Sequence, residues 1–357
     1  SVTTTAWTEP ILFLLVMGDA VLLNKGTNIF IGTVSFLTEN VSIILQLATS
    51  MDYSIFLLDA FMNYRKQGMN EEDAIINAVQ EAINSIFASS LTTVVGFLAL
   101  VTMKFSIGFD LGLVLAKGIV FSLLTVVFFM PAMILKFAKL NERTKHKSFM
   151  PDFHGLGKVI YRIRPIVFAV IVLVTPLAYT AQGLNDFLYG NDSMGASEGT
   201  QVYEDDQQIT KIFGRSNMLL ALYPNTSEVN ERAMAKEIKA LPYVKSVTAL
   251  ADTLPEGIPE EFLPKSTVEL LHKGGYCRML VYTRTKTESA EAFKDSDEIQ
   301  TIVKKYYPEG SYLVGETPST QDIKSFIVKD YENVNVLSLA GVFLVVMMSF
   351  KSAVVPI

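Results

Sequence analysis

The sequence predicts a polytopic α-helical membrane protein that carries a folded α+β domain outside the membrane. Half of the 357 residues are hydrophobic and only 18% are charged, whereas soluble domains average about 25% charged residues. Six apolar runs are long enough to cross a bilayer, which takes roughly 20 residues as a helix. One polar stretch, 183–330, separates the fifth run from the sixth and contains 23 acidic and 16 basic residues.

The composition also narrows the class of function. A net charge of −6 gives no basic surface for nucleic acid. The single cysteine, Cys277, rules out an internal disulfide framework, and the three histidines, His146, His154 and His272, lack the spacing of metal ligands. We therefore predict no nucleic-acid partner, no metal or other cofactor and no enzymatic activity. Because the chain starts at Ser1 without a signal-peptide pattern, we expect it to be an internal piece of a longer protein.

The apolar runs are the predicted membrane spans. They cover 6–23, 37–61, 83–103, 107–138, 165–181 and 334–350. The loop at 139–164 is rich in Lys and Arg, which marks it as cytoplasmic. Alternating crossings then place 183–330 outside the membrane, on the side opposite the cytoplasm. Residues 1–138 then hold four spans and a cytoplasmic surface helix at 70–84, and 139–164 is the basic loop. A fifth span lies in 165–182 and is followed by the outer domain at 183–330. Residues 331–357 hold a sixth span and the start of the next loop.

The outer domain is predicted as two successive β-α-β units. The predicted strands are 218–223, 244–250, 276–283 and 311–315, and the predicted helices are 227–241, capped by Thr226, and 289–306. Between the units, 252–265 is predicted as a loop or flap because it contains three prolines. Two β-α-β units in sequence suggest a split β-α-β, ferredoxin-like sandwich.

Two ionisable residues inside the predicted spans are the main candidates for function, because burying a charge there costs at least about 2.5 kcal/mol. Asp52 lies in the middle of the second span, and Lys117 lies about 15 Å from the outer end of the fourth. A Lys side chain is long enough to reach Asp52 if the helices are neighbours. We predict an Asp52–Lys117 pair that a proton arriving on Asp52 would break. A static pair, or a Lys117 exposed to a water-filled cleft, are the alternatives.

Three further residues are predicted as accessory relay groups. Asp59 follows Asp52 by seven residues, so it shares the same helical face and either extends a proton path or is an ordinary helix-end charge. Ser89 and Thr93 belong to a cluster of small and hydroxyl residues in the third span. Such a cluster either hydrogen-bonds a buried charge or only permits close helix packing.

The string 45–57, LQLATSMDYSIFL, resembles the Asp-Tyr motif in the fourth transmembrane helix of the mycobacterial-membrane-protein-large (MMPL) family, of the resistance-nodulation-division (RND) superfamily. Further matches follow in the order of the family. They are Tyr64-Arg65, Gly68, Ala74-Ile75, Ser90-Leu91-Thr92-Thr93, Gly96-Phe97, Asp110-Leu111-Gly112, Lys117-Gly118 and Pro131. Gly26-Thr27-Asn28 before the motif and Val314-Gly315-Glu316 before the last span also fit the branch seen in Gram-positive bacteria. The ordered set covers nearly the whole chain.

The resemblance implies an RND-type bundle made of the third to eighth transmembrane helices, with 183–330 as the second porter domain. The first porter domain and the second membrane half would lie outside this chain. The implied function is proton-motive-force-driven export of hydrophobic or amphipathic molecules, such as lipids, lipopeptides or drugs. Asp52, Tyr53 and Lys117 would form the proton relay, and Asp52-Tyr53 would work with a matching pair in the missing half. The expected partners are protons, a lipid or amphiphile substrate and the membrane, and a homo-oligomer is left open.

Three other functions are considered. A SecDF-like accessory of protein translocation shares the membrane core of the superfamily. A lipid- or sterol-sensing regulator would bind the same molecules without transporting them. An intramembrane aspartyl protease needs a Tyr-Asp and a Gly-x-Gly-Asp pair, whereas this chain has Asp52-Tyr53 in the reverse order and Val16-Met17-Gly18-Asp19. The order of these residues argues against a protease.

Overall fold

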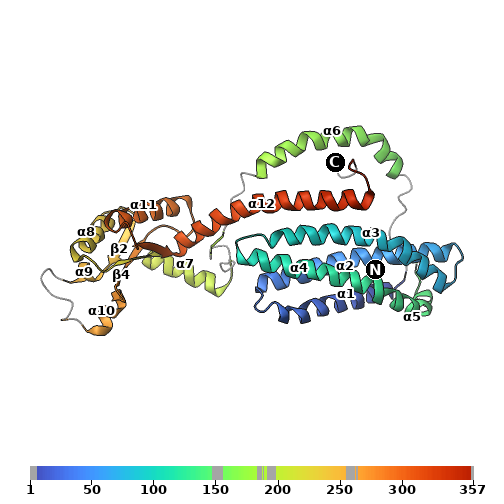
Figure 1. The fold of residues 1–357 in the computed structure, drawn as a ribbon, viewed down its shortest axis with the longest axis horizontal. Helices are drawn as coiled ribbons and strands as arrows, with labels where there is room; N and C mark the ends of the chain where they lie inside the picture. Colours follow the sequence, from blue (N-terminus) through green and yellow to red (C-terminus); the bar gives the residue numbers. More distant parts are fainter. Residues whose placement is uncertain are drawn as a thin grey trace. The chain divides into compact units, whose positions relative to one another are not determined.

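The structure is a computed structural model that describes residues 6–146, 156–182, 187, 189–190, 198–254, 262 and 264–354. The chain forms two compact units. The membrane unit comprises Ser1–Pro176 and Phe326–Ile357, and the sheet unit comprises Leu177–Ser325. Figure 1 shows long helices in the first and a small sheet with flanking helices in the second.

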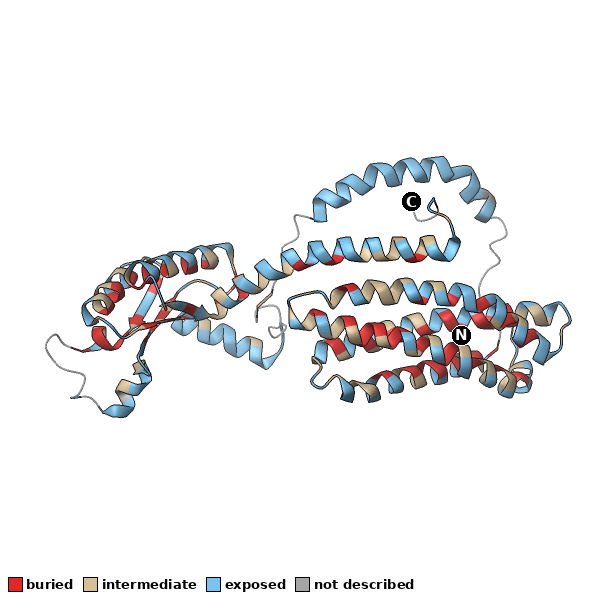
Figure 2. Ribbon diagram, viewed as in Figure 1, coloured by how far each residue is buried: buried red, intermediate tan, exposed pale blue. Residues whose placement is uncertain are grey.

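Six helices among the described residues are long and apolar enough to cross a membrane. They are α1 (Glu9–Gly26, continued by the 3-10 turn η1, Thr27–Phe30), α2 (Phe36–Lys66), α3 (Glu71–Leu100), α4 (Ser106–Leu124) joined to α5 (Met130–Arg143) by the π-helical turn η2 (Thr125–Phe129), α6 (Leu156–Gln182) and α12 (Glu316–Phe350). Every side chain described in α6 is exposed (Figure 2). The prediction of a polytopic helical membrane protein is confirmed at this level.

Helix ends in the membrane unit carry recognisable caps. Ser35 Oγ accepts a hydrogen bond from the backbone N–H of Leu37 at the start of α2, and Asn70 Oδ1 accepts one from Asp73 at the start of α3. The start of α4 is capped from another helix. Asp330 on α12 accepts hydrogen bonds from the backbone N–H groups of Lys104 (2.8 Å) and Phe105 (3.3 Å). A carboxylate is favourable there because a helix N-terminus carries partial positive charge.

The prediction of a separate surface helix at 70–84 is wrong. The structure has one continuous helix, α3, from Glu71 to Leu100. No Pro or Gly interrupts the first 25 residues of α3, and its buried residues recur about one turn apart through both halves. These buried residues include Ala74, Ala78, Ala82, Ile86 and Ser90. One packed stripe runs through both halves, so nothing divides the charged half from the apolar half.

The fourth predicted span, 107–138, forms α4 and α5 with the π-helical turn η2 between them. The buried residues Ser122, Val126, Met130 and Ile134 are each four residues apart. A straight α-helix has 3.6 residues per turn, so such a spacing would drift around the helix. The wider turn at η2 absorbs this drift and keeps the four side chains inside the bundle.

In the membrane bundle, α2 packs against α1, α3 and α4. The contact between α3 and α4 is close at Gly112. A Cβ atom built at Gly112 would lie 2.7 Å from the backbone oxygen of Phe97 and 2.9 Å from the backbone nitrogen of Val101. Glycine at this position therefore allows the two helix backbones to approach each other, as small residues commonly do in membrane bundles.

The sheet unit has an antiparallel sheet with strand order β2-β4-β1-β5 and a short strand β3 paired with β4. In chain order its elements are α7 (Gln201–Phe213), β1 (Asn217–Pro224), α8 (Glu228–Lys239), β2 (Val244–Thr248), α9 (Leu250–Thr253), α10 (Lys265–Leu271), β3 (His272–Lys273), β4 (Tyr276–Thr283), α11 (Ala290–Tyr306) and β5 (Tyr312–Gly315). Alternate residues of β1 and β4 are buried, and α8 and α11 contribute to the same core. Half-buried alternation of this kind is typical of an antiparallel sheet covered on one face.

The four strands and two helices predicted for this unit lie where expected, with small differences at their ends. Ser227, and not Thr226, caps α8, because Ser227 Oγ accepts from the backbone N–H of Asn230 at 3.2 Å. The strand predicted at 244–250 ends at Thr248 and is followed by α9. Of the loop predicted at 252–265, residues 255–261 and 263 lie outside the described residues. The helices α7 and α10 and the strand β3 were not predicted.

Replacing Gly112 with Ala should destabilise the membrane unit, because the new Cβ would contact the rigid backbone of α3. Overpacking of this kind costs about 1–3 kcal/mol, partly offset by the better helix propensity of Ala. Gly96→Ala is the matched control, since Gly96 also lies in a helix and has no heavy atom within 4 Å of a built Cβ. Detergent-induced unfolding in bicelles should rank Gly112→Ala below wild type and below Gly96→Ala. Equal stability of the two variants would contradict the close contact.

Candidate functional site

Lys117 is held at the C-terminal end of α1. Its ammonium group donates hydrogen bonds to the backbone oxygen of Asn24 at 2.9 Å and to Asn28 Oδ1 at 2.6 Å. Asn24 lies in the last turn of α1 and Asn28 lies in η1. The last carbonyl groups of a helix lack partners within the helix and carry partial negative charge. The end of α1 therefore provides a site for a cation within the bundle.

A buried amide network lies beside Lys117 and joins three helices. Gln46 Nε2, on α2, donates to the backbone oxygens of Ala20 on α1 (2.9 Å) and Gly118 on α4 (3.1 Å). Gln46 Oε1 accepts a hydrogen bond from Asn24 Nδ2 at 3.0 Å. Asn24 and Gln46 are only 1% and 2% exposed. A Cβ atom at Gly118 would lie 2.8 Å from Asn24 Nδ2, so glycine is what lets this amide fit.

The structure does not contain the predicted Asp52–Lys117 pair. Both residues are described, and no ion pair joins them; Lys117 bonds to α1 instead, and Asp52 is exposed. The residue of α2 that lies level with Gly118 and Lys117 is Gln46. Asp52 follows Gln46 by six residues, which places it about 9 Å further along the helix and turned about 120° away. The prediction measured depth from helix ends and did not anticipate that α1 ends beside Gln46.

Asp52 and Asp59 share one exposed face of α2, as their seven-residue spacing predicts. The exposed Ile55 and Phe56 lie between them in sequence. Tyr53 points elsewhere, because successive helix residues are about 100° apart. It is 6% exposed and belongs to the apolar core of the bundle. The carboxylate of Asp52 and the ring of Tyr53 therefore occupy different environments in this structure.

Among the described residues, no hydrogen bond joins Ser89 or Thr93 to Asp52 or Lys117. The hydroxyl of Thr93 donates to the backbone oxygen of Ser89 within α3 at 2.9 Å, and the Ser89 side chain is exposed. Other hydroxyls are buried in the bundle without a hydrogen-bond partner among the described atoms. They belong to Ser50 and Ser54 on α2, Ser90 on α3 and Ser122 on α4. Together with Gln46, the two serines of α2 continue one stripe at four-residue spacing.

The apolar helices, the buried amide network and the cation held at a helix end define an α-helical polytopic membrane protein with a polar site inside its bundle. Residues 10–162 match the MMPL family model. This part of the chain, which contains α1 to α5 and the start of α6, is similar to the MMPL family. The resemblance seen in the sequence is thereby confirmed over residues 10–162.

Known proteins similar to this chain are longer than it is. Membrane protein MJ1562 of Methanocaldococcus jannaschii is 40% identical over 89 residues, which is 25% of this chain and 23% of that protein. The crystal structure of SecDF from Thermus thermophilus, a translocon-associated membrane protein, is 14% identical with a TM-score of 0.52, covering 96% of this chain and 40% of SecDF. SecDF in its super-membrane-facing form gives 15% identity and a TM-score of 0.49, with 95% and 40% covered. At these identities the similarity to SecDF concerns the fold alone.

Replacing Gln46 with Leu should destabilise the bundle, because the carbonyl groups of Ala20 and Gly118 and the amide of Asn24 would lose a shared partner in an apolar environment. We expect a loss of about 1–2 kcal/mol. Thr49→Val is the control, since the Thr49 hydroxyl bonds only to its own helix. Unfolding in bicelles should show Thr49→Val near wild type and Gln46→Leu clearly below it. A Gln46→Leu protein as stable as the control would mean that the network does not hold the helices.

Proposed function

We propose that this chain is part of a proton-motive-force-driven exporter of hydrophobic or amphipathic molecules in the bacterial cytoplasmic membrane. The main support is a carboxylate, Asp52, in the middle of an apolar membrane helix of an MMPL-family bundle. A charge facing lipid at that depth is costly, so intramembrane carboxylates face protein or water and commonly carry protons. The exposed face of Asp52 and Asp59 is therefore the surface at which we place the second membrane half.

In this proposal Asp52 carries the transported proton. A proton moving down a potential of 100 mV releases about 2.3 kcal/mol, which is enough to bias a rearrangement of helices. Tyr53 is the adjacent phenol that would donate a hydrogen bond to a carboxylate of the second half once the helix turns. Lys117 is the positive group of the relay. Because Asn24 and Asn28 hold it in the state described, the relay needs a second state in which the ammonium leaves them.

Asp59 would extend the path towards the cytoplasm, since it lies on the face of Asp52. Ser89 and Thr93 were predicted as accessory groups, but their contacts give no reason to keep them in the relay. The buried hydroxyls of Ser50 and Ser54 are better candidates, because they continue the stripe that starts at Gln46.

The sheet unit is proposed as a ferredoxin-like porter domain outside the membrane, at 183–330. Two features support this assignment. The helices α8 and α11 each connect two strands that are not neighbours, and the order β2-β4-β1-β5 leaves one strand between each connected pair. This is the split β-α-β arrangement. The unit would take a lipid or amphiphile from the outer leaflet and pass it on as the membrane helices move.

The proton-relay proposal predicts that Asp52→Asn, in the complete protein, abolishes efflux that depends on the proton gradient. We expect the rate to fall at least about tenfold, a difference of about 1.4 kcal/mol. Asp59→Asn is the matched control on the same face of α2 and should lower the rate less. Efflux of a fluorescent amphiphile from cells or proteoliposomes with an imposed pH gradient measures both. Full efflux by Asp52→Asn would refute the mechanism.

A second candidate function is an accessory role in protein translocation, favoured by the fold similarity to SecDF at a TM-score of 0.52. The two candidates differ in cargo. Depletion of the complete protein should change the efflux of lipids or drugs and leave secretion of a reporter protein unchanged if it is an exporter. Slower secretion with unchanged lipid and drug efflux would favour the accessory role.

A further inference from the structure

Three residues from three strands form a row across one face of the sheet unit. In the β3–β4 hairpin His272 lies opposite Cys277, and in the β1–β4 pair Tyr223 lies opposite the same Cys277. Directly opposite residues of antiparallel strands point to the same face and have Cβ atoms about 4.5–5.5 Å apart. The hairpin turn consists of Gly274 and Gly275, both with positive φ, as a two-residue turn of this kind requires. The turn therefore fixes the pairing of His272 with Cys277.

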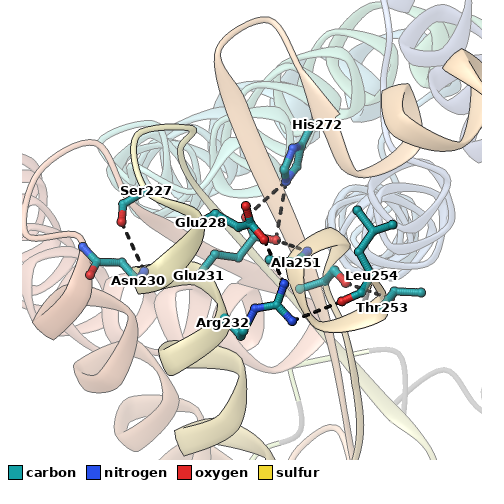
Figure 3. A network of polar contacts seen from close by, with 10 residues as sticks. Ser227, Glu228, Asn230, Glu231, Arg232, Ala251, Thr253, Leu254 and His272 are labelled. Carbon is teal, nitrogen blue, oxygen red and sulfur yellow. Dashed lines mark hydrogen bonds and ion pairs between the residues drawn. The ribbon is translucent and has the colours of Figure 1, made fainter. Parts of the chain in front are cut away.

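The helix α8 adds a carboxylate to this row. Glu231 Oε2 lies 3.1 Å from His272 Nε2, and Glu231 Oε1 accepts a hydrogen bond from the backbone N–H of Ala251 at 3.1 Å (Figure 3). One ligand atom from each of Glu231, His272 and Cys277 lies within 4.8 Å of the other two. Glu231 is 2% exposed, Cys277 is 1% exposed, and the His272 side chain is 11% exposed. The cluster is thus buried, with its edge open to solvent at His272.

The composition of this cluster suits a cation. The Glu231 carboxylate lies within hydrogen-bond distance of His272 Nε2 and accepts a hydrogen bond from the Ala251 amide. Beside it, the fully buried hydroxyl of Tyr223 lies close to the same carboxylate. Carboxylate, imidazole and thiol therefore meet in one buried cluster, and all three are groups that bind metal ions.

We propose that Glu231, His272 and Cys277 bind a divalent transition-metal ion, with Zn²⁺ as the best fit to their chemistry. Thiolate, imidazole and carboxylate are the three ligand types that Zn²⁺ takes in proteins, at about 2.0–2.3 Å. A tetrahedral site with such bonds places its ligand atoms about 3.3–3.8 Å apart. The three atoms here lie within 4.8 Å of one another, so small side-chain movements would close the site. The fourth position is left to water.

Such an ion would change the stability of the sheet unit. It would join Glu231 of α8 to His272 and Cys277 of the β3–β4 hairpin, which follow it by about 40 residues. Binding requires the thiol of Cys277 to release its proton to solvent and His272 to be neutral, so affinity rises with pH. A ligand that binds only the folded state stabilises it, and the stabilisation grows with the logarithm of the ligand concentration above the dissociation constant. The alternative is a metal-free role in which His272 and Glu231 form only a structural ion pair.

Titration of the whole chain in detergent, stripped with a chelator, tests the site with Co²⁺ as a spectroscopic probe. We expect one equivalent of Co²⁺ to produce thiolate-to-cobalt charge-transfer absorption, and Zn²⁺ to displace it and raise the melting temperature. Cys277→Ala should abolish the absorption. Removing a residue that only hydrogen-bonds to a metal ligand weakens binding by about 10- to 100-fold. His272→Ala removes a ligand itself, so it should weaken binding by at least about tenfold.

Two further variants keep the test decisive. Lys273→Ala, on the exposed neighbour of His272 in the same hairpin, should bind Co²⁺ like wild type. Glu231→Gln keeps an oxygen for the Ala251 amide, so it should stay folded, as circular dichroism can verify, while losing affinity. Folded wild-type protein that shows no charge-transfer band, or a band that persists in Cys277→Ala, would overturn the proposal and leave the cluster a structural ion pair.

Discussion

The side-chain amide of Gln46 makes three hydrogen bonds that connect α2 to α1 and α4. Its effect on the rest of the membrane unit is geometric. Because the amide must reach the backbone oxygens of Ala20 and Gly118, it fixes the rotation of α2 about its own axis. That rotation places Tyr53 in the core and Asp52 on the outside. The same contact brings the end of α1 next to Lys117, where the last carbonyl groups hold the ammonium.

Hydrogen bonds to buried polar groups fix the packing in both units. In the membrane unit the buried amides of Asn24 and Gln46 bond to each other and to backbone carbonyls, and Asp330 satisfies two N–H groups before α4. Leaving such groups unpaired costs about 1–3 kcal/mol each, so they fix one arrangement of helices. In the sheet unit Glu231 accepts a hydrogen bond from the Ala251 amide and lies 3.1 Å from His272 Nε2. Pairing is not complete in the membrane unit, because the hydroxyls of Ser50, Ser54, Ser90 and Ser122 have no hydrogen-bond partner among the described atoms.

Features that depend on local pattern could be predicted from the sequence. The length of apolar runs located the six spans, short apolar runs located β1 and β4, and helical periodicity located α8 and α11. Features that depend on where one helix ends relative to another could not be predicted from the sequence. The Asp52–Lys117 pair failed because the level at which α1 stops is a tertiary property. The cluster of Glu231, His272 and Cys277 was missed because its ligands meet through strand pairing, although the Gly274-Gly275 turn between His272 and Cys277 was a usable signal.

The π-helical turn η2 has a consequence for comparison with relatives. One residue more per turn rotates everything after it by about 100° relative to an uninterrupted helix. The inward faces of α4 and α5 are therefore in different sequence registers, although they belong to one span. A relative whose corresponding helix lacks this turn would align correctly only with a gap of one residue between 125 and 129. Without that gap, the residues paired with Ile134 and Ala138 would be ones that face outward.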